Sequence, residues 1–566
     1  SIRRSAQGKT WATRLFIDPL SLTGNYSTGT NQTEYTLASS NSYSVLAGYN
    51  AVMPRHDKHL GLAGVAGWLP RFMRDGEFGK GLKGASFNLV PSSIRLTSGL
   101  SRVAGNQLTY QSPIFLGSDT AIVPTISLVH LWRNSAGFTL QPLGMLILGG
   151  DIASTRDLRE YSDSTTLGRV VNGSRKSFLG IDAGVERDRS ITTTFNLTPR
   201  IASWLRPRFN TNSSFFLLRS LTTVPPIQFG PDSMFILPQT LNNLRGRELG
   251  MAVDASKLAS SAFGEKSGIA SFLRGFRPFD FSDRLVRSSA YDMASFDPDL
   301  SFMLGLGGLD NFLSHQGEQA LSVLETRTGT IAGGANLGLG LSFQLAYSRI
   351  RSDRLQRQGD IYQTTETLQR EWPSGSLRLT RALTKGPLAV LSLGTTYRQR
   401  NGTVSQSGAG GNQTLTRSTS FNPDATFSFR NGMSVAMRYL STTQDNQAFD
   451  NLSRSTQQNI SGNFSYTLRL PETMSKTRRA IRTSLSGGYT KSQNCLASQG
   501  SADCRILSDV RRQEAQAGLD TELFKVLTGG LQAGYVLDDA RSLDRKVSQL
   551  FISLNFTLSL FAGDYR

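Results

Sequence analysis

Residues 551–560 read F-I-S-L-N-F-T-L-S-L. Every second residue from Ile552 to Leu560 is apolar, and the residues between them are small or polar. Phe551, at the start of the segment, shares the polar face. Strict alternation places the apolar side chains on one face of a β-strand, and about ten residues suffice for a strand to cross a bilayer. A strand with lipid on one side and water on the other has this pattern. Because a half-buried strand of a soluble sandwich also alternates, the recurrence of the pattern decides the fold.

The same alternation recurs along the C-terminal part of the chain. Asn431-Gly432 separates two alternating runs, which is a strong hairpin signal because both residues tolerate positive φ. Pro471 ends another run, and Thr528-Gly529-Gly530 predicts a turn. The alternating positions are Leu337, Leu339, Leu341, Phe343, Leu345 and Tyr347; Ala425, Phe427 and Phe429; Met433, Val435, Met437 and Tyr439; Ile460, Gly462, Phe464, Tyr466, Leu468 and Leu470; Ile481, Thr483, Leu485 and Tyr489; and Leu531, Ala533, Tyr535 and Leu537.

The connections between these strands differ in length. Tight turns such as Asn431-Gly432 contrast with polar stretches at residues 402–418 and 491–511, for which we predict long loops. Short turns at one end of the strands and long loops at the other are typical of outer-membrane barrels. Four tyrosines lie near predicted strand ends, where they fit either an interfacial girdle or ordinary strand aromatics: Tyr347, Tyr397, Tyr439 and Tyr489.

The pattern divides the chain into three regions. Residues 1–224 are predicted to be N-terminal barrel strands with more interruptions, and residues 321–566 to be C-terminal barrel strands. Residues 225–320 differ, because apolar residues recur there at helical spacing (Ala252, Ala255, Leu258, Ala259, Ala262 and Phe263). We predict a partly helical insertion in the lumen or at the rim, outside the lipid-facing wall. An irregular extramembrane loop is the alternative.

The fold class follows from these patterns. No run of about 18 apolar residues occurs, which excludes a helical membrane span. Alternating strands hide their apolar content from averages, so the mean hydropathy of −0.24 does not argue against a barrel. We therefore predict an all-β protein, a large antiparallel outer-membrane β-barrel of about 18 to 24 strands, or the incomplete C-terminal part of a larger barrel.

The chain is strongly basic, with 61 Lys and Arg residues against 42 Asp and Glu and a net charge of +19. Solvated arginines in a lumen and in loops account for this excess. Attraction to anionic lipid headgroups, acidic cargo or glycans is the functional alternative. We expect no nucleic-acid partner, because no compact basic motif with interleaved aromatic residues occurs.

The chain has two cysteines, Cys495 and Cys504, in the segment C-L-A-S-Q-G-S-A-D-C. A zinc site would require closer pairs and more ligands. We predict a disulfide that closes an exposed surface loop, which implies an oxidising compartment such as the periplasm or the cell surface.

Residues that would support catalysis are scarce. His56 and His59 form an H-x-x-H motif without a third ligand nearby, and a surface loop explains them better than a metal site. The sequence has no G-x-S-x-G, Walker or H-E-x-x-H motif. We therefore expect no enzymatic activity, no cofactor and no metal.

Three segments resemble a known family. Residues 84–102 read G-A-S-F-N-L-V-P-S-S-I-R-L-T-S-G-L-S-R, in which Phe87, Pro91, Ser92 and Ser93 match an F-N-x-x-P-S-S pattern before a strand. Residues 129–161 combine an aromatic and basic strand with a strand that ends in a charged cluster, and residues 191–210 read I-T-T-T-F-N-L-T-P-R-I-A-S-W-L-R-P-R-F-N. In this order the segments resemble the C-terminal barrel portion of the SprA (Sov) family, the outer-membrane translocon of type IX secretion and gliding motility.

The resemblance implies a function in protein transport. Family members form a very large transmembrane barrel through which folded cargo proteins leave the periplasm, with accessory subunits of the PorV and periplasmic plug type. The family offers no catalytic residues to carry over, and no role is known for the P-S-S motif. The chain departs from the family in its shorter length and its lower content of Asn and Tyr. It starts at Ser1 without Met or a signal peptide, so we expect a mature chain or the C-terminal part of a longer protein.

Other classes of protein share the barrel pattern. A porin, a TonB-dependent receptor or a lipopolysaccharide-transport barrel would also alternate, although a TonB-dependent receptor should begin with a mixed α/β plug that the first residues do not suggest. A secreted all-β adhesin should show separable domains at regular intervals, and no such repeat is visible.

Overall fold

A computed structural model describes residues 2–3, 13–53, 58–59, 86–110, 124–178, 180–221, 226–229, 234–264, 267–407, 413–449, 451–469, 480–498, 504–524 and 527–558. The chain is an all-β protein, as predicted. Within these described residues the main sheet has 21 strands, which lies within the predicted range. Two compact units divide the chain: unit 1 comprises residues 1–250, 284–326 and 354–362, and unit 2 comprises residues 251–283, 327–353 and 363–566.

In unit 1 the strands pair antiparallel in the order β1-β2-β3-β6-β7-β8-β11-β12. Neighbours in this order follow one another along the chain among the main-sheet strands, which suits an antiparallel sheet. The bounds are β1 Ile2–Arg3, β2 Leu20–Gln32, β3 Thr36–Val52, β6 Ser93–Thr109, β7 Thr125–Leu143, β8 Leu146–Asp157, β11 Val185–Leu197 and β12 Leu205–Arg219.

In unit 2 each strand from β21 to β29 pairs antiparallel with the next along the chain. The bounds are β21 Ile361–Ala382, β22 Leu388–Gln406, β23 Gln413–Phe429, β24 Ser434–Ala448, β25 Asn451–Arg469, β26 Ala480–Ser498, β27 Arg505–Phe524, β28 Leu527–Ala540 and β29 Arg545–Leu558. The main sheet also contains β15 Gln239–Val253, β16 Phe276–Ala294, β19 Ser322–Asn336 and β20 Leu341–Gln358.

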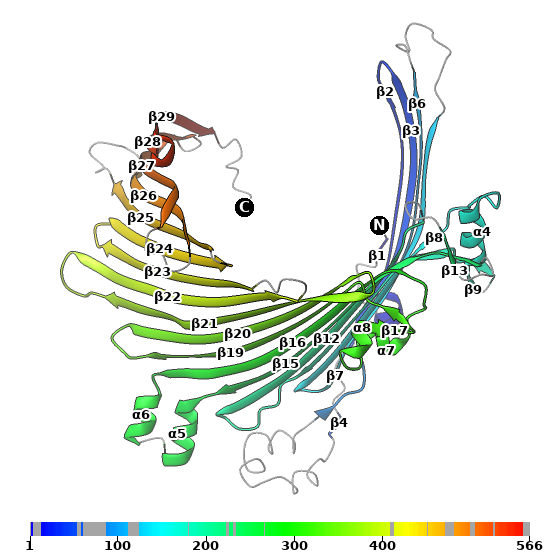
Figure 1. Ribbon diagram of the computed structural model, residues 1–566, viewed down its shortest axis with the longest axis horizontal. Helices are drawn as coiled ribbons and strands as arrows, with labels where there is room; N and C mark the ends of the chain where they lie inside the picture. The colour runs from blue at the N-terminus through cyan, green and yellow to red at the C-terminus, as the bar shows by residue number, and fades with distance from the viewer. Residues whose placement is uncertain are drawn as a thin grey trace. The chain divides into compact units, whose positions relative to one another are not determined.

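Short elements lie outside the main sheet. Figure 1 shows α5 and α6 side by side, and α7, α8 and β17 gathered together. The helices are a π-helix at Thr13–Ile17, α4 Thr166–Gly173, α5 Ala255–Phe263, α6 Gly268–Leu273, α7 Leu300–Met303, α8 Asp310–Leu313 and a 3-10 helix at Arg541–Leu543. The short strands form four pairs: β4 Lys58–His59 with β5 Ser86–Phe87, β9 Ser177–Phe178 with β10 Ile181–Asp182, β13 Ile227–Phe229 with β14 Met234–Ile236, and β17 Ser314–His315 with β18 Glu318–Gln319.

The prediction that residues 225–320 form one insertion is wrong. β15 and β16 belong to the main sheet, whereas the β13–β14 pair, α5–α6 and residues 295–321, here named the docked segment, lie outside it. The helical spacing was read correctly, since α5 covers Ala255–Phe263 and is capped by the Asp254 carboxylate. The charged residues of β15 interrupt the apolar alternation, so the sequence did not indicate a strand there. Arg245, for example, donates to the Gly305 carbonyl of the docked segment at 2.9 Å.

Three predicted connections also differ from the structure. Leu339 lies in a turn rather than in a strand, because Gly338, Leu339 and Gly340 all have positive φ. Thr528 to Gly530 lie inside β28 and pair with β27. The polar stretches 402–418 and 491–511 are mostly strand, because β22 continues to Gln406 and β26 to Ser498. Ser, Thr and Asn occupy both faces there, so no alternation marks these strand ends.

The Asn431-Gly432 hairpin is confirmed. β23 ends at Phe429 and β24 begins at Ser434, with Gly432 at a φ of 84°. The Asn431 side chain accepts a hydrogen bond from the Met433 N–H at 3.1 Å, which fixes the turn.

Within unit 1, a core of buried side chains joins the docked segment to the sheet. Phe302 of α7 is 2% exposed, and its ring packs edge-on against Phe215, Tyr291 and Phe296. The Tyr291 hydroxyl donates to the Phe312 carbonyl at 3.2 Å, so the polar end of this ring is satisfied. Burial of aromatic rings on this scale holds the docked segment firmly against β12, β15 and β16.

Candidate functional site

One face of the unit 2 sheet is polar. The strand register aligns a single row of residues from β21 to β27: Arg378, Gly394, Asp424, Arg438, Ser461, Gly488 and Glu514. Basic, acidic and small residues therefore lie beside one another across seven strands. Opposite charges in neighbouring strands attract, which stabilises this register modestly.

Glycines in this row make room for the carboxylates. A Cβ added at Gly394 would collide with the Asp424 carboxylate, and one added at Gly488 would lie 3.2 Å from Glu514 Oε1. The same arrangement recurs where Asp520 faces Gly530 and Asp151 of unit 1 faces Gly137. The Asp424 carboxylate thus lies against the sheet, whereas the Glu514 side chain remains more than half exposed.

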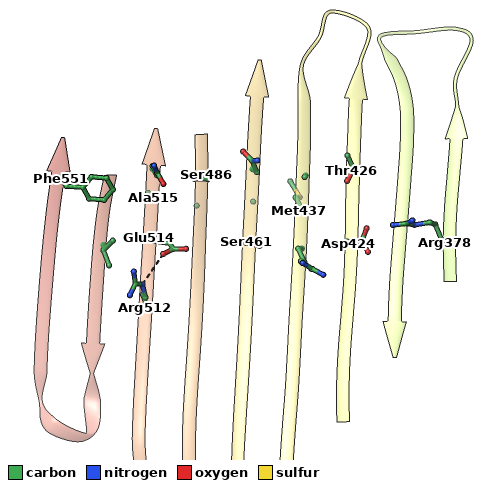
Figure 2. A pocket seen from close by; sticks show the side chains of 17 residues that line it. Arg378, Asp424, Thr426, Met437, Ser461, Ser486, Arg512, Glu514, Ala515 and Phe551 are labelled. Atoms are coloured by element: carbon green, nitrogen blue, oxygen red, sulfur yellow. Dashed lines mark ion pairs between the residues drawn. The ribbon is translucent and has the colours of Figure 1, made fainter. Parts of the chain in front are cut away.

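The polar row borders a cavity of about 650 Å³. Figure 2 shows its side chains on adjacent strands, with Arg378 and Asp424 at one side and Phe551 at the other. Arg512 and Glu514 form an ion pair at 3.4 Å, and both side chains are more than half exposed. An exposed pair of this kind contributes little to stability. The side chains that line the cavity are therefore open to water and carry both signs of charge.

The opposite face of the same strands is apolar. The register aligns a second row over β22 to β29, in which every residue is apolar: Leu391, Phe427, Val435, Phe464, Leu485, Ala517, Ala533 and Ile552. Each residue from Leu391 to Ala517 lies three positions from a member of the polar row on its own strand, so the two rows occupy opposite faces. Ile552 and its neighbour Leu554 are 68% and 66% exposed.

Aromatic residues gather on the apolar face. The register places Tyr439 and Tyr489 on either side of Ile460, and the ring of Phe421 lies edge-on to Tyr439. Tyr347 and Trp372 are also in edge contact, beside an apolar groove of about 420 Å³. Tyr347, Tyr439 and Tyr489 lie inside strands rather than near strand ends, so the interfacial girdle stays a prediction beside ordinary strand aromatics.

The P-S-S motif has a local structural role. Ser93 begins β6, where it pairs with Val52 and Thr139. The Ser92 N–H and hydroxyl both donate to the Thr139 carbonyl, at 2.8 and 3.0 Å. Pro91 precedes this contact, whereas the Phe87 side chain lies outside the described residues. The motif therefore sets the start of a strand.

Cys495 and Cys504 form a disulfide, with Cα atoms 5.6 Å apart. We expected Cys495 to lie in a surface loop. Instead it lies inside β26, where it pairs with Arg454 and Ile506 and is 7% exposed. Only Cys504 lies outside a strand, directly before β27. The prediction of a loop failed because β26 continues through polar residues.

Within the described ranges, no three His, Cys, Asp or Glu side chains are arranged to hold a metal ion. His59 lies in β4, and His56 lies outside the described residues. The described part of the chain also has no helix that is long and apolar enough to cross a membrane.

Sequence reasoning missed the polar row itself. Its only signal in the sequence is a set of glycines and acids, which become neighbours once the strand register is known.

Comparison with known proteins gives limited information. No family model and no curated protein matches the sequence, so the resemblance to SprA receives no support from them. Several solved structures show a likeness, and two of them illustrate it. The β domain of the Bordetella autotransporter BrkA has 13% identity over 42% of this chain and 92% of its own, with a TM-score of 0.16. The siderophore receptor PirA from Acinetobacter baumannii has 10% identity over 91% of this chain and 75% of its own, with a TM-score of 0.25. Because both TM-scores are below 0.5, neither likeness supports a conclusion about this chain.

Proposed function

We propose that the chain forms the wall of an outer-membrane β-barrel that serves as a protein-export conduit. The observation that carries this proposal is the separation of the two faces of unit 2. An apolar row crosses eight strands on one face, and a charged and hydroxylated row crosses seven on the other. Exposed side chains such as Ile552 and Leu554 are unfavourable in water and favourable in lipid.

The polar face supports a water-filled passage rather than a packed core. Its exposed charges, such as Arg512 and Glu514, are open to water. A hydrated wall with both signs of charge suits passage of varied proteins better than tight binding of one solute. The resemblance to the SprA translocon points the same way. We propose no catalysed reaction.

The proposed partners follow from the two faces. Outer-membrane lipid and lipopolysaccharide would cover the apolar face, and secreted cargo proteins would pass along the polar face. Accessory subunits of the PorV and plug type would gate and seal the conduit, as the resemblance implies.

Deletion of the gene tests the proposal. We expect cargo proteins to accumulate in the periplasm while uptake of small solutes is unchanged. Intact secretion with failed uptake of one nutrient would instead support a porin or a receptor. Recovery of the full chain in the soluble secreted fraction would support an adhesin.

A further inference from the structure

A second cavity, of about 880 Å³, lies in unit 1. Four adjacent strands contribute their ends to it: β8 and β12 end there, and β11 and β15 begin there. Its walls are α4 with the turn after it, β14, and the start of the docked segment at Ser295 to Pro298. A volume of this size is typical of ligand pockets. We name it the arginine pocket.

Contacts within the protein hold the walls of the arginine pocket in place. Val171 of α4 is completely buried against Val185 and Leu221. The Arg156 guanidinium donates to the carbonyls of Ala183 and Gly184, at 2.6 and 3.1 Å. The pocket is therefore preorganised, which lowers the cost of binding.

Positive charge predominates in the pocket. Five cationic side chains line it, against two carboxylates: Arg156, Arg169, Lys176, Arg189 and Arg219 against Glu186 and Asp297. Glu186 is shared between Arg189 at 2.5 Å and Arg219 at 3.7 Å. Asp297 is 95% exposed and lies 3.6 Å from Arg219, so it neutralises little of this charge. Arg169 and Lys176 are exposed at the margin.

Gln239 lines the pocket and carries a buried acceptor to which no described residue donates. Gln239 is 4% exposed, and its amide nitrogen donates to the Phe296 carbonyl. Its Oε1 atom has no hydrogen-bond partner among the described residues. A buried acceptor without a donor is unfavourable, so a ligand that supplies an N–H would be stabilised here. Apolar side chains complete the lining, among them Leu217 and Leu237.

We propose that the arginine pocket binds the C-terminal end of a peptide. The terminal carboxylate would bind Arg189 and Arg219, because guanidinium groups match the geometry of a carboxylate. The last backbone N–H would donate to Gln239 Oε1, and an apolar last side chain would lie against Leu217 and Leu237. Inorganic phosphate supplies the charge but neither the N–H nor the apolar group.

Binding of a defined probe to the full chain in detergent tests the proposal. The probe is a fluorescein-labelled Ser-Ala-Val-Leu peptide with a free carboxylate, and its matched control is the same peptide with a C-terminal amide. We expect the free acid to bind about tenfold more tightly than the amide by fluorescence polarisation. Equal binding of the two peptides, or no binding of either, would overturn the proposal, as would displacement by phosphate at the concentration at which acetyl-Ser-Ala-Val-Leu displaces the probe.

Variants locate the binding to the pocket. The double change Arg169→Gln and Lys176→Gln alters exposed residues, so the fold should be unaffected; we expect affinity to fall about threefold and to depend less on salt. Arg219→Gln should lower affinity about tenfold. Arg438→Gln on the polar row of unit 2 is the control and should leave affinity unchanged. If the double variant binds as the unmodified chain does, or Arg438→Gln is as damaging as Arg219→Gln, the assignment is wrong. Because the probe is a soluble peptide, this result does not depend on whether the chain exports proteins.

Discussion

The two units use apolar side chains in different ways. In unit 1 the docked segment covers part of the sheet, and Phe302 is 2% exposed. In unit 2 the strands carry an apolar row on one face, and Phe556 of β29 is 64% exposed. Burial inside the chain stabilises the first arrangement, whereas the second requires an apolar surrounding. A rule that apolar residues mark the core therefore holds for the docked segment and fails for the exposed strand face.

The largest effect that this contrast predicts is in the core of unit 1. Phe302→Ala should destabilise the packing of the docked segment by about 3–5 kcal/mol, because it leaves a cavity among three aromatic rings. Hydrogen exchange at residues 295–321 should accelerate strongly. Phe556→Ala is the matched control and should leave exchange in unit 1 unchanged. Equal effects of the two changes would remove the distinction between the units.

A charge on the apolar face should have the next largest effect. Leu554→Arg should disfavour insertion into lipid vesicles by about 2–4 kcal/mol, since the charge would lie in the hydrocarbon. Ser553→Arg places the same charge on the adjacent residue and the opposite face, so insertion should be nearly normal. Protease protection of the inserted chain measures both variants. Insertion that fails equally for both would mean that the faces are not distinguished by lipid.

The disulfide should stabilise only the strand ends it joins. Replacement of Cys495 and Cys504 by Ser removes a cross-link between residues at a sequence separation of 9. This loss should lower local stability by about 2 kcal/mol. Hydrogen exchange should rise at the end of β26 and the start of β27. Exchange at β8 and β11 of unit 1 serves as the internal control, and acceleration there would contradict a local role.

The smallest predicted effect is the titration of Tyr161, which follows β8 in unit 1. Burial raises the pKa of Tyr161 to about 12, and the Asp157 carboxylate adds to this shift. Because the folded state favours the neutral phenol, its contribution to stability is complete below pH of about 10, the value for an unfolded chain, and is lost as the pH rises toward 12. Ultraviolet absorbance should show this late ionisation, and Tyr161→Phe should remove it. Ionisation near the ordinary pKa would show that the loop is open to water.

Much of unit 2 was predictable from the sequence. Alternation identified β23 to β26 because their apolar residues occupy one face only, and Asn431-Gly432 fixed a turn because positive φ selects such residues. Helical spacing similarly identified α5.

The remainder depends on contacts that sequence periodicity does not encode. Leu339 continued an apolar alternation yet lies in a turn, because the two flanking glycines allow the chain to reverse. β15 carries Asn243 and Arg245, which bind carbonyls of the docked segment some 60 residues away. The polar row and the arginine pocket are assembled from several strands each, so their residues are scattered in the sequence.

The central claim is that lipid covers the apolar face of unit 2, and β29 tests it most directly. Both native cysteines are in the disulfide, so single cysteines placed at positions 550–556 can carry a spin label without competition. In lipid nanodiscs, accessibility to oxygen should be high at Leu550, Ile552, Leu554 and Phe556, and accessibility to a water-soluble nickel chelate should be high at Phe551, Ser553 and Asn555. Uniform accessibility to the nickel chelate, or alternation of the opposite phase, would contradict the account.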